Sequence, residues 1–153
     1  MFVRCGTISI EGDAERLRIR GILDELGIDI EMLRVGPGVA PGTIWFDKKK
    51  TQYMRYNVPH IKSKAEGRIR LGGKWRRIKG VALVEHVTQN IGLHEYGKMW
   101  NRMRVLSSDT TMILGGFEPT ESFDRGYNLL ILARNGKIIH IANDVIIEPT
   151  KRT

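Results

Sequence analysis

The stretch RIRLGGKWRRIKGVALVEHV, residues 68–87, has strand-like runs on both sides of Gly72-Gly73. Two glycines accept the positive φ angles that a two-residue hairpin turn requires. Strand side chains alternate between two faces, and cross-strand partners share a face. One face of this hairpin would carry three arginines around an indole: Arg68, Arg70, Arg77 and Trp75. The other face would carry apolar side chains that point to the core: Ile69, Leu71 and Ile78.

The positive charge of the chain is concentrated around this hairpin. The net charge is +8, and residues 48–79 hold twelve of the 25 Lys and Arg residues but only one acid, Glu66. Flat rings, on which nucleobases can stack, lie among the cations: Trp45, Phe46, Tyr53, Tyr56 and Trp75. Because a segregated positive charge favours a polyanionic partner, the sequence predicts a nucleic-acid-binding protein, for DNA or RNA.

The binding surface predicted on this basis is a β surface over residues 48–79. Lysine and arginine would neutralise phosphates, and Trp75 would offer a stacking platform. The residues assigned to it are Lys48, Lys49, Lys50, Arg55, Lys62, Lys64, Arg68, Arg70, Trp75, Arg76, Arg77 and Lys79.

Two helices are predicted outside the basic β-rich segment, which spans residues 43–87. Asp13 can accept hydrogen bonds from the free amides of a first helical turn, and Gly27 can end the helix. The apolar residues between them have helical spacing: Leu17, Ile22, Leu23 and Leu26. With strands at 2–10 and 28–35, this helix would complete a β-α-β unit. A second set with helical spacing predicts a helix over 91–104: Leu93, Tyr96, Trp100 and Met103.

Further strands are expected towards the C-terminus. Asn135-Gly136 is a strong turn signal between the runs 127–134 and 137–147, and residues 110–114 form a short strand. Pro59 makes a central strand over 51–67 unfavourable. We therefore expect one α+β domain over residues 1–153, built as a mostly antiparallel sheet or small barrel with an N-terminal β-α-β unit and two helices.

An alternative function is a Mg²⁺-dependent nuclease, because one stretch resembles the PD-(D/E)xK nuclease core. The resemblance rests on acids in the run IDIE, residues 28–31, followed by Asp47-Lys48-Lys49. It implies that Asp29 or Glu31 and Asp47 hold Mg²⁺, while Lys49 stabilises the developing charge. No catalysis and no cofactor are expected outside this alternative.

Another alternative is a structural subunit of an oligomeric, virion-like assembly that faces packaged DNA. The single cysteine, Cys5, cannot form an internal disulfide, which favours a reducing intracellular compartment and leaves cytoplasm and virion open. No apolar run approaches the ~18 residues of a membrane span, so no membrane partner is expected. The four histidines match no zinc-site spacing, so no metal site is expected.

Overall fold

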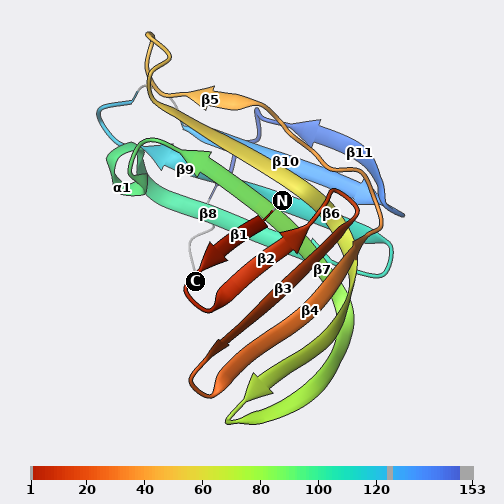
Figure 1. Ribbon diagram of the computed structural model, residues 1–153. Coiled ribbons are helices and arrows are strands. Elements are labelled where there is room, and N and C mark those ends of the chain that lie inside the picture. Colours follow the sequence, from red (N-terminus) through yellow and green to blue (C-terminus); the bar gives the residue numbers. More distant parts are fainter. Residues whose placement is uncertain (1, 124–125, 149–153) are drawn as a thin grey trace, which may run out of the picture. The chain divides into compact units, whose positions relative to one another are not determined.

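The computed structural model describes residues 2–123 and 126–148, and these form an almost entirely antiparallel β structure (Figure 1). The strands are β1 Phe2–Cys5, β2 Ile8–Gly12, β3 Arg16–Leu23, β4 Leu26–Arg34, β5 Thr43–Trp45, β6 Tyr53–Leu71, β7 Lys74–Gln89, β8 Gly97–Leu106, β9 Thr110–Pro119, β10 Tyr127–Arg134 and β11 Lys137–Ala142. Within the described ranges the helical structure is the four-residue α1, Leu93–Tyr96. No helix there is both long and apolar enough to cross a membrane.

The described chain divides into two compact units. Unit 1 comprises residues 2–39 and 58–85, and unit 2 comprises residues 40–57 together with the described part of 86–148. Strands β6 and β7 contribute residues to both units. Each unit has a buried cluster of its own.

Unit 1 is built on the strand order β1-β2-β3-β4-β6, with β7 also paired to β6. Its core is one face of this sheet, where Leu17, Met32 and Ala65 are buried. Leu17 lies opposite Met32, and Met32 lies opposite Ala65, so the three form one row across β3, β4 and β6. Partly buried side chains extend the row: Ile10, Ile19, Ile30, Ala82 and Val84.

The predicted N-terminal β-α-β unit is wrong, because residues 16–34 form the hairpin of β3 and β4. Residues 16–20, RLRIR, alternate charged and apolar side chains, which is the period of a strand. Pairing with β4 buries Leu17 and leaves Arg16 exposed. Asp13 accepts backbone hydrogen bonds, as expected of a cap, but from Glu15 and Arg16 in the turn before β3.

The predicted helix over 91–104 is also wrong beyond its first turn. Only Leu93–Tyr96 is helical, and β8 begins at Gly97. Tyr96 is fully buried, and the chain then alternates along β8 beside β9. With two helices reduced to four residues, the α+β class is replaced by an antiparallel β fold.

Both predicted hairpin turns are confirmed. Strand β6 ends at Leu71 and β7 begins at Lys74, with φ angles of 54° at Gly72 and 75° at Gly73. Asn135 and Gly136 also have positive φ angles between β10 and β11. The expectation against a strand through Pro59 is wrong: β6 runs through it, and Val58 exchanges both backbone hydrogen bonds with Val39.

Unit 2 contains the sheet order β11-β10-β9-β8 and an aromatic core. Tyr96 stacks on Phe46 with ring centroids 4.3 Å apart, and its ring also meets Phe117 at 5.0 Å. The Tyr96 hydroxyl donates to Gln89 Oε1 at 2.9 Å. Burial raises the pKa of Tyr96 to about 12, so this phenol stays protonated and continues to donate at alkaline pH values where an exposed tyrosine ionises.

Candidate ligand-binding pocket

The predicted basic face of the β6–β7 hairpin forms, but carboxylates of β4 lie on the same face. Asp29 is opposite Arg68 in the register of β4 and β6, and their side chains form an ion pair at 3.4 Å. Asp29 also accepts a hydrogen bond from Arg18 Nη2 at 2.8 Å. The Arg18 hydrogen bond holds the pKa of Asp29 below its ordinary value. Asp29 therefore neutralises part of the charge that the sequence assigned to phosphate binding.

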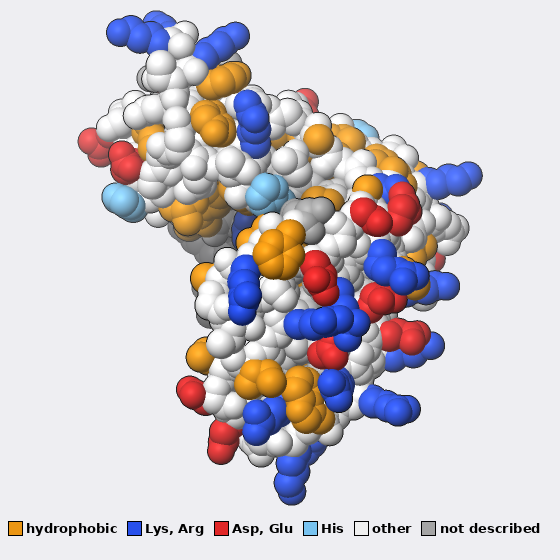
Figure 2. Space-filling model, in the orientation of Figure 1, with side chains coloured by type: hydrophobic (Ala, Val, Ile, Leu, Met, Phe, Trp, Pro, Cys, Tyr) orange, Lys and Arg blue, Asp and Glu red, His pale blue; other side chains and the backbone are white. Residues whose placement is uncertain are grey.

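Opposite charges alternate over much of this face of unit 1. Figure 2 shows Lys and Arg intermixed with Asp and Glu over β1–β4. Three further ion pairs cross the sheet: Arg16–Glu31 at 3.7 Å, Arg20–Glu11 at 3.6 Å and Lys79–Glu66 at 2.8 Å. Exposed pairs of this kind contribute only tenths of a kcal/mol each, but they remove the uncompensated field that would attract a polyanion.

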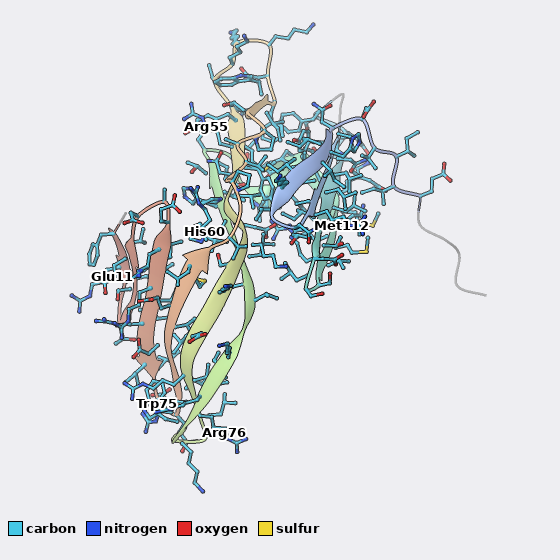
Figure 3. The ribbon with its side chains drawn as sticks, turned by 90° about the vertical axis from the view of Figure 1, so that its right-hand side faces the viewer. Glu11, Arg55, His60, Trp75, Arg76 and Met112 are labelled. Atoms are coloured by element: carbon cyan, nitrogen blue, oxygen red, sulfur yellow. The ribbon has the colours of Figure 1, made fainter. Side chains whose placement is uncertain are left out.

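Trp75 lies within this surface near the hairpin turn. The Arg68 guanidinium is 4.7 Å from the centre of its ring, and the indole also covers Gly27 of β4. Figure 3 shows Trp75 and Arg76 on opposite sides of the hairpin tip, as strand alternation requires. Of the three residues predicted to point to the core, Ile69 and Ile78 are half-buried, while Leu71 is 49% exposed beside the turn.

The remaining predicted nucleic-acid contacts are scattered. Lys48, Lys49 and Lys50 are exposed in the loop between β5 and β6, and Arg55 bonds Thr43 Oγ1. Lys62 is buried, which removes it from any surface that phosphates could reach. Among the aromatic residues, Tyr56 is buried and Phe46 packs in the core of unit 2.

The acids of the nuclease alternative are held in local structural bonds. Asp47 accepts hydrogen bonds from the backbone amides of Thr51 and Gln52, both at 2.8 Å. These bonds, chiefly the one from the Gln52 amide, lower the pKa of Asp47 below its ordinary value. Asp29 and Glu31 pair with arginines in unit 1, whereas Asp47 and Lys49 belong to unit 2. In the described ranges, no three His, Cys, Asp or Glu side chains come together as a metal site.

A pocket of about 460 Å³ lies in unit 2, a feature that sequence reasoning missed. Its walls come from the unit 2 ends of β6 and β7, from α1, and from β8, β9 and β10. The lining residues are Met54, Tyr56, Val87, Gln89, Leu93, Trp100, Arg102, Arg104, Ile113, Gly115, Gly116, Phe117, Tyr127 and Leu129.

The strand register explains why this pocket is open. Cross-strand partners form rows over β8, β9 and β10: Trp100–Phe117–Tyr127, then Arg102–Gly115–Leu129, then Arg104–Ile113–Ile131. The middle row has glycine at its centre. A Cβ atom built on Gly115 would have its nearest neighbour at 3.5 Å, so a methyl group fits without a clash. Gly115 therefore places no side chain between the aromatic row and the side chains of Arg102 and Arg104, which lie 3.9 Å and 3.6 Å from the built Cβ atom.

Two arginines, Arg102 and Arg104, lie among the polar side chains that line the pocket. Arg104 is anchored, since Nη1 donates to the Leu114 carbonyl at 2.9 Å and Nη2 to the Tyr56 hydroxyl at 3.2 Å. Arg102 lies one row away and is exposed. Among the residues that the structure describes, no aspartate or glutamate lines the pocket. The sequence signal for this site is the alternation W-x-R-x-R at residues 100–104, which in a strand places the three side chains on one face. The predicted helix over 91–104 would have pointed them in different directions.

No protein-family model, curated protein or solved structure matches this chain, so a functional proposal rests on the geometry described above.

Proposed function

We propose that unit 2 binds a small, largely apolar molecule in the pocket between β8–β10 and the ends of β6 and β7. The volume of about 460 Å³ falls within the range of roughly 300–1,000 Å³ typical of small-molecule sites. Such sites are mostly apolar with a few placed polar groups, and the lining has this composition. The observation that carries the proposal is the pocket of about 460 Å³ that Gly115 lines beside the row Trp100–Phe117–Tyr127.

A packed core of the same strands would place a side chain where Gly115 stands. Protein interiors are close-packed, and empty space costs stability because its lining loses contacts. An apolar guest would recover those contacts and would remove the exposed parts of the aromatic row from water. Leu129 and Phe117 are buried in the pocket wall and give it a preformed shape. The chemistry supported by these residues is binding, because the described lining combines aromatic and aliphatic side chains with two arginines.

The proposal predicts that filling the space above Gly115 abolishes binding. Titration of the full chain with the neutral dye N-phenyl-1-naphthylamine should give saturable fluorescence enhancement. In Gly115→Leu, the new side chain occupies the pocket, and the affinity should fall by about tenfold or more, because roughly 1.5–3 kcal/mol of apolar burial is displaced.

Gly115→Ala is the matched control. Its methyl group meets only ordinary van der Waals contacts, so dye affinity should stay within about threefold of the parent chain. The thermal midpoint of Gly115→Leu should be equal or higher, which separates pocket filling from unfolding. Equal dye binding by the parent chain and Gly115→Leu, or no saturable binding by the parent chain, would reject the pocket.

Nucleic-acid binding is a second candidate, favoured by one specific observation at the tip of the β6–β7 hairpin. Trp75 is 38% exposed there, and Lys74, Arg76 and Arg77 are exposed around it. These cations are not among the ion pairs that neutralise the β3–β4 part of the face. A single strand could contact this tip through stacking and phosphate contacts. The nuclease and assembly-subunit alternatives stay hypotheses without such an observation.

If this tip binds nucleic acid, Arg76→Ser with Arg77→Ser should weaken binding of a single-stranded oligonucleotide by about tenfold at moderate salt. Loss of two phosphate contacts should also flatten the log–log salt slope by about 1.4, at ~0.7 per phosphate. Arg16→Ser with Arg20→Ser removes the same charge from the ion-paired region and should have a smaller effect. Fluorescence anisotropy at several salt concentrations measures all three proteins. An affinity that does not change with salt, or absent binding at low salt, would remove this candidate.

A further inference from the structure

The charged side chains that line the pocket are arginines, in contrast to the ion-paired face of unit 1. Of the described side chains, two guanidinium groups and no carboxylate line the pocket. On the outer face of unit 1, by contrast, Arg18 bonds Asp29 at 2.8 Å, and Arg16 and Arg20 also have acidic partners. Within residues 2–123 and 126–148, Arg104 bonds the Tyr56 hydroxyl and a carbonyl, whereas Arg102 has neither a hydrogen bond nor an ion pair.

We propose that the pocket ligand is an amphiphile with one anionic head group, of the carboxylate type, which binds the Arg102 guanidinium. This inference rests on the proposed function, because it names the ligand class of the same pocket. Arginine presents a planar fork of donors that matches a carboxylate in a bidentate arrangement. Arg102 is exposed, so the head group can lie at the solvent-facing edge of the pocket.

The register places the two ends of such a ligand on neighbouring rows. Arg102 faces Gly115, and the next row is Trp100–Phe117–Tyr127. A carboxylate on Arg102 would therefore direct the attached apolar chain past Gly115 and towards the aromatic row, all of which line the pocket. A cationic side chain on one row and aromatic rings on the next would fit a molecule that is charged at one end and apolar along the rest.

Arg104 assists without being the primary contact. Its bonds to the Leu114 carbonyl and the Tyr56 hydroxyl fix its guanidinium on the row beyond Arg102. A fixed positive charge near the head group adds attraction for an anion and disfavours a cation. Arg104→Gln would disturb these structural bonds, so it is a poor probe of ligand charge. Arg102→Gln removes one charge and breaks no described hydrogen bond or ion pair.

The test is displacement of N-phenyl-1-naphthylamine from the full chain by three ligands with the same ten-carbon tail: decanoate, 1-decanol and decyltrimethylammonium. We expect decanoate to bind about tenfold or more tightly than 1-decanol, because a charge-assisted hydrogen bond adds to the same apolar burial. Decyltrimethylammonium should bind more weakly than 1-decanol. In Arg102→Gln, decanoate and 1-decanol should bind within about threefold of each other, because the charge that distinguishes them is gone.

Lys137→Gln is the charge-matched control, since Lys137 is exposed on β11 and outside the pocket lining. It should keep the full preference for decanoate. Equal displacement by decanoate and 1-decanol from the parent chain would overturn the anionic head group while leaving apolar binding in place. A preference for decanoate that survives Arg102→Gln would overturn the assignment to Arg102. Absence of dye binding and of displacement by any of the three would reject the pocket itself, and this inference with it.

Discussion

Gly67→Ala is expected to lower the free energy of unfolding of unit 1 by at least about 3 kcal/mol. Gly67 lies opposite Ile30 in the pairing of β6 with β4. A Cβ atom at this position would lie 2.1 Å from the Asp29 carbonyl oxygen and 2.7 Å from Ile30 Cα. Both obstructing atoms belong to backbone in the middle of a sheet, so relief requires β4 and β6 to separate. Amide hydrogen exchange of Ile30 and its neighbours should accelerate, together with a lower denaturation midpoint.

Gly80→Ala provides the control for this change. Gly80 lies on β7 of the same unit, and a Cβ atom there would have no heavy-atom neighbour within 4 Å. Replacing a strand glycine where space and φ allow it reduces the entropy of the unfolded chain, so its effect should lie between neutral and about 1 kcal/mol of stabilisation. Similar losses in both variants would show that glycine flexibility matters here, and not the close approach of β4 to Gly67.

Tyr96→Ala should destabilise unit 2 by about 3–5 kcal/mol, the range for truncating a large buried aromatic residue. Tyr96 is 0% exposed and lies at the centre of the aromatic cluster, in ring contact with Phe46, Trp100 and Phe117. Its removal leaves a cavity beside Trp100, which also lines the ligand pocket. Denaturation followed by tryptophan fluorescence should show the earlier transition, and dye binding should weaken in parallel.

Tyr96→Phe separates the ring from its hydroxyl. The ring contacts remain, and the loss should be only about 1–3 kcal/mol, because Gln89 Oε1 loses its donor. Alkaline pH gives a second measurement. The pKa of Tyr96 is raised in the folded chain, so its protonated form is favoured by folding, and stability falls as pH rises from about 10 through about 12. Tyr96→Phe should lose this part of the alkaline dependence, and an unchanged profile would contradict burial of the phenol.

The two wrong helices show why spacing alone was insufficient. Leu17 and Leu26 are compatible with a helix, yet Arg16, Arg18 and Arg20 alternate with apolar residues over the same stretch. The strand period is selected because β4 offers Asp29 and Glu31 as cross-strand partners and Met32 as a core partner for Leu17. Tertiary pairing overrides a weak local preference in this way.

The candidate site was still less accessible from sequence. The sequence shows that Trp100, Arg102 and Arg104 alternate along one strand. Gly115 and Leu129 join the row of Arg102 only because β9 pairs with both β8 and β10. The basic hairpin shows the reverse problem. Arg68 and Trp75 do share a face, but Asp29 reaches that face from a strand about forty residues away.

By itself, the sequence determined what depends on neighbouring residues: the turn at Gly72-Gly73 and the turn at Asn135-Gly136. Turn conformation and strand alternation are set by local backbone sterics, so a few residues specify them. Only the tertiary structure decided which distant strands become partners. That pairing placed acids among the arginines of unit 1 and opened a pocket at Gly115 in unit 2. The physical reason is that the register of two paired strands fixes which side chains share a face. That register depends on how much apolar surface both strands bury along their whole length, and one segment alone does not specify it.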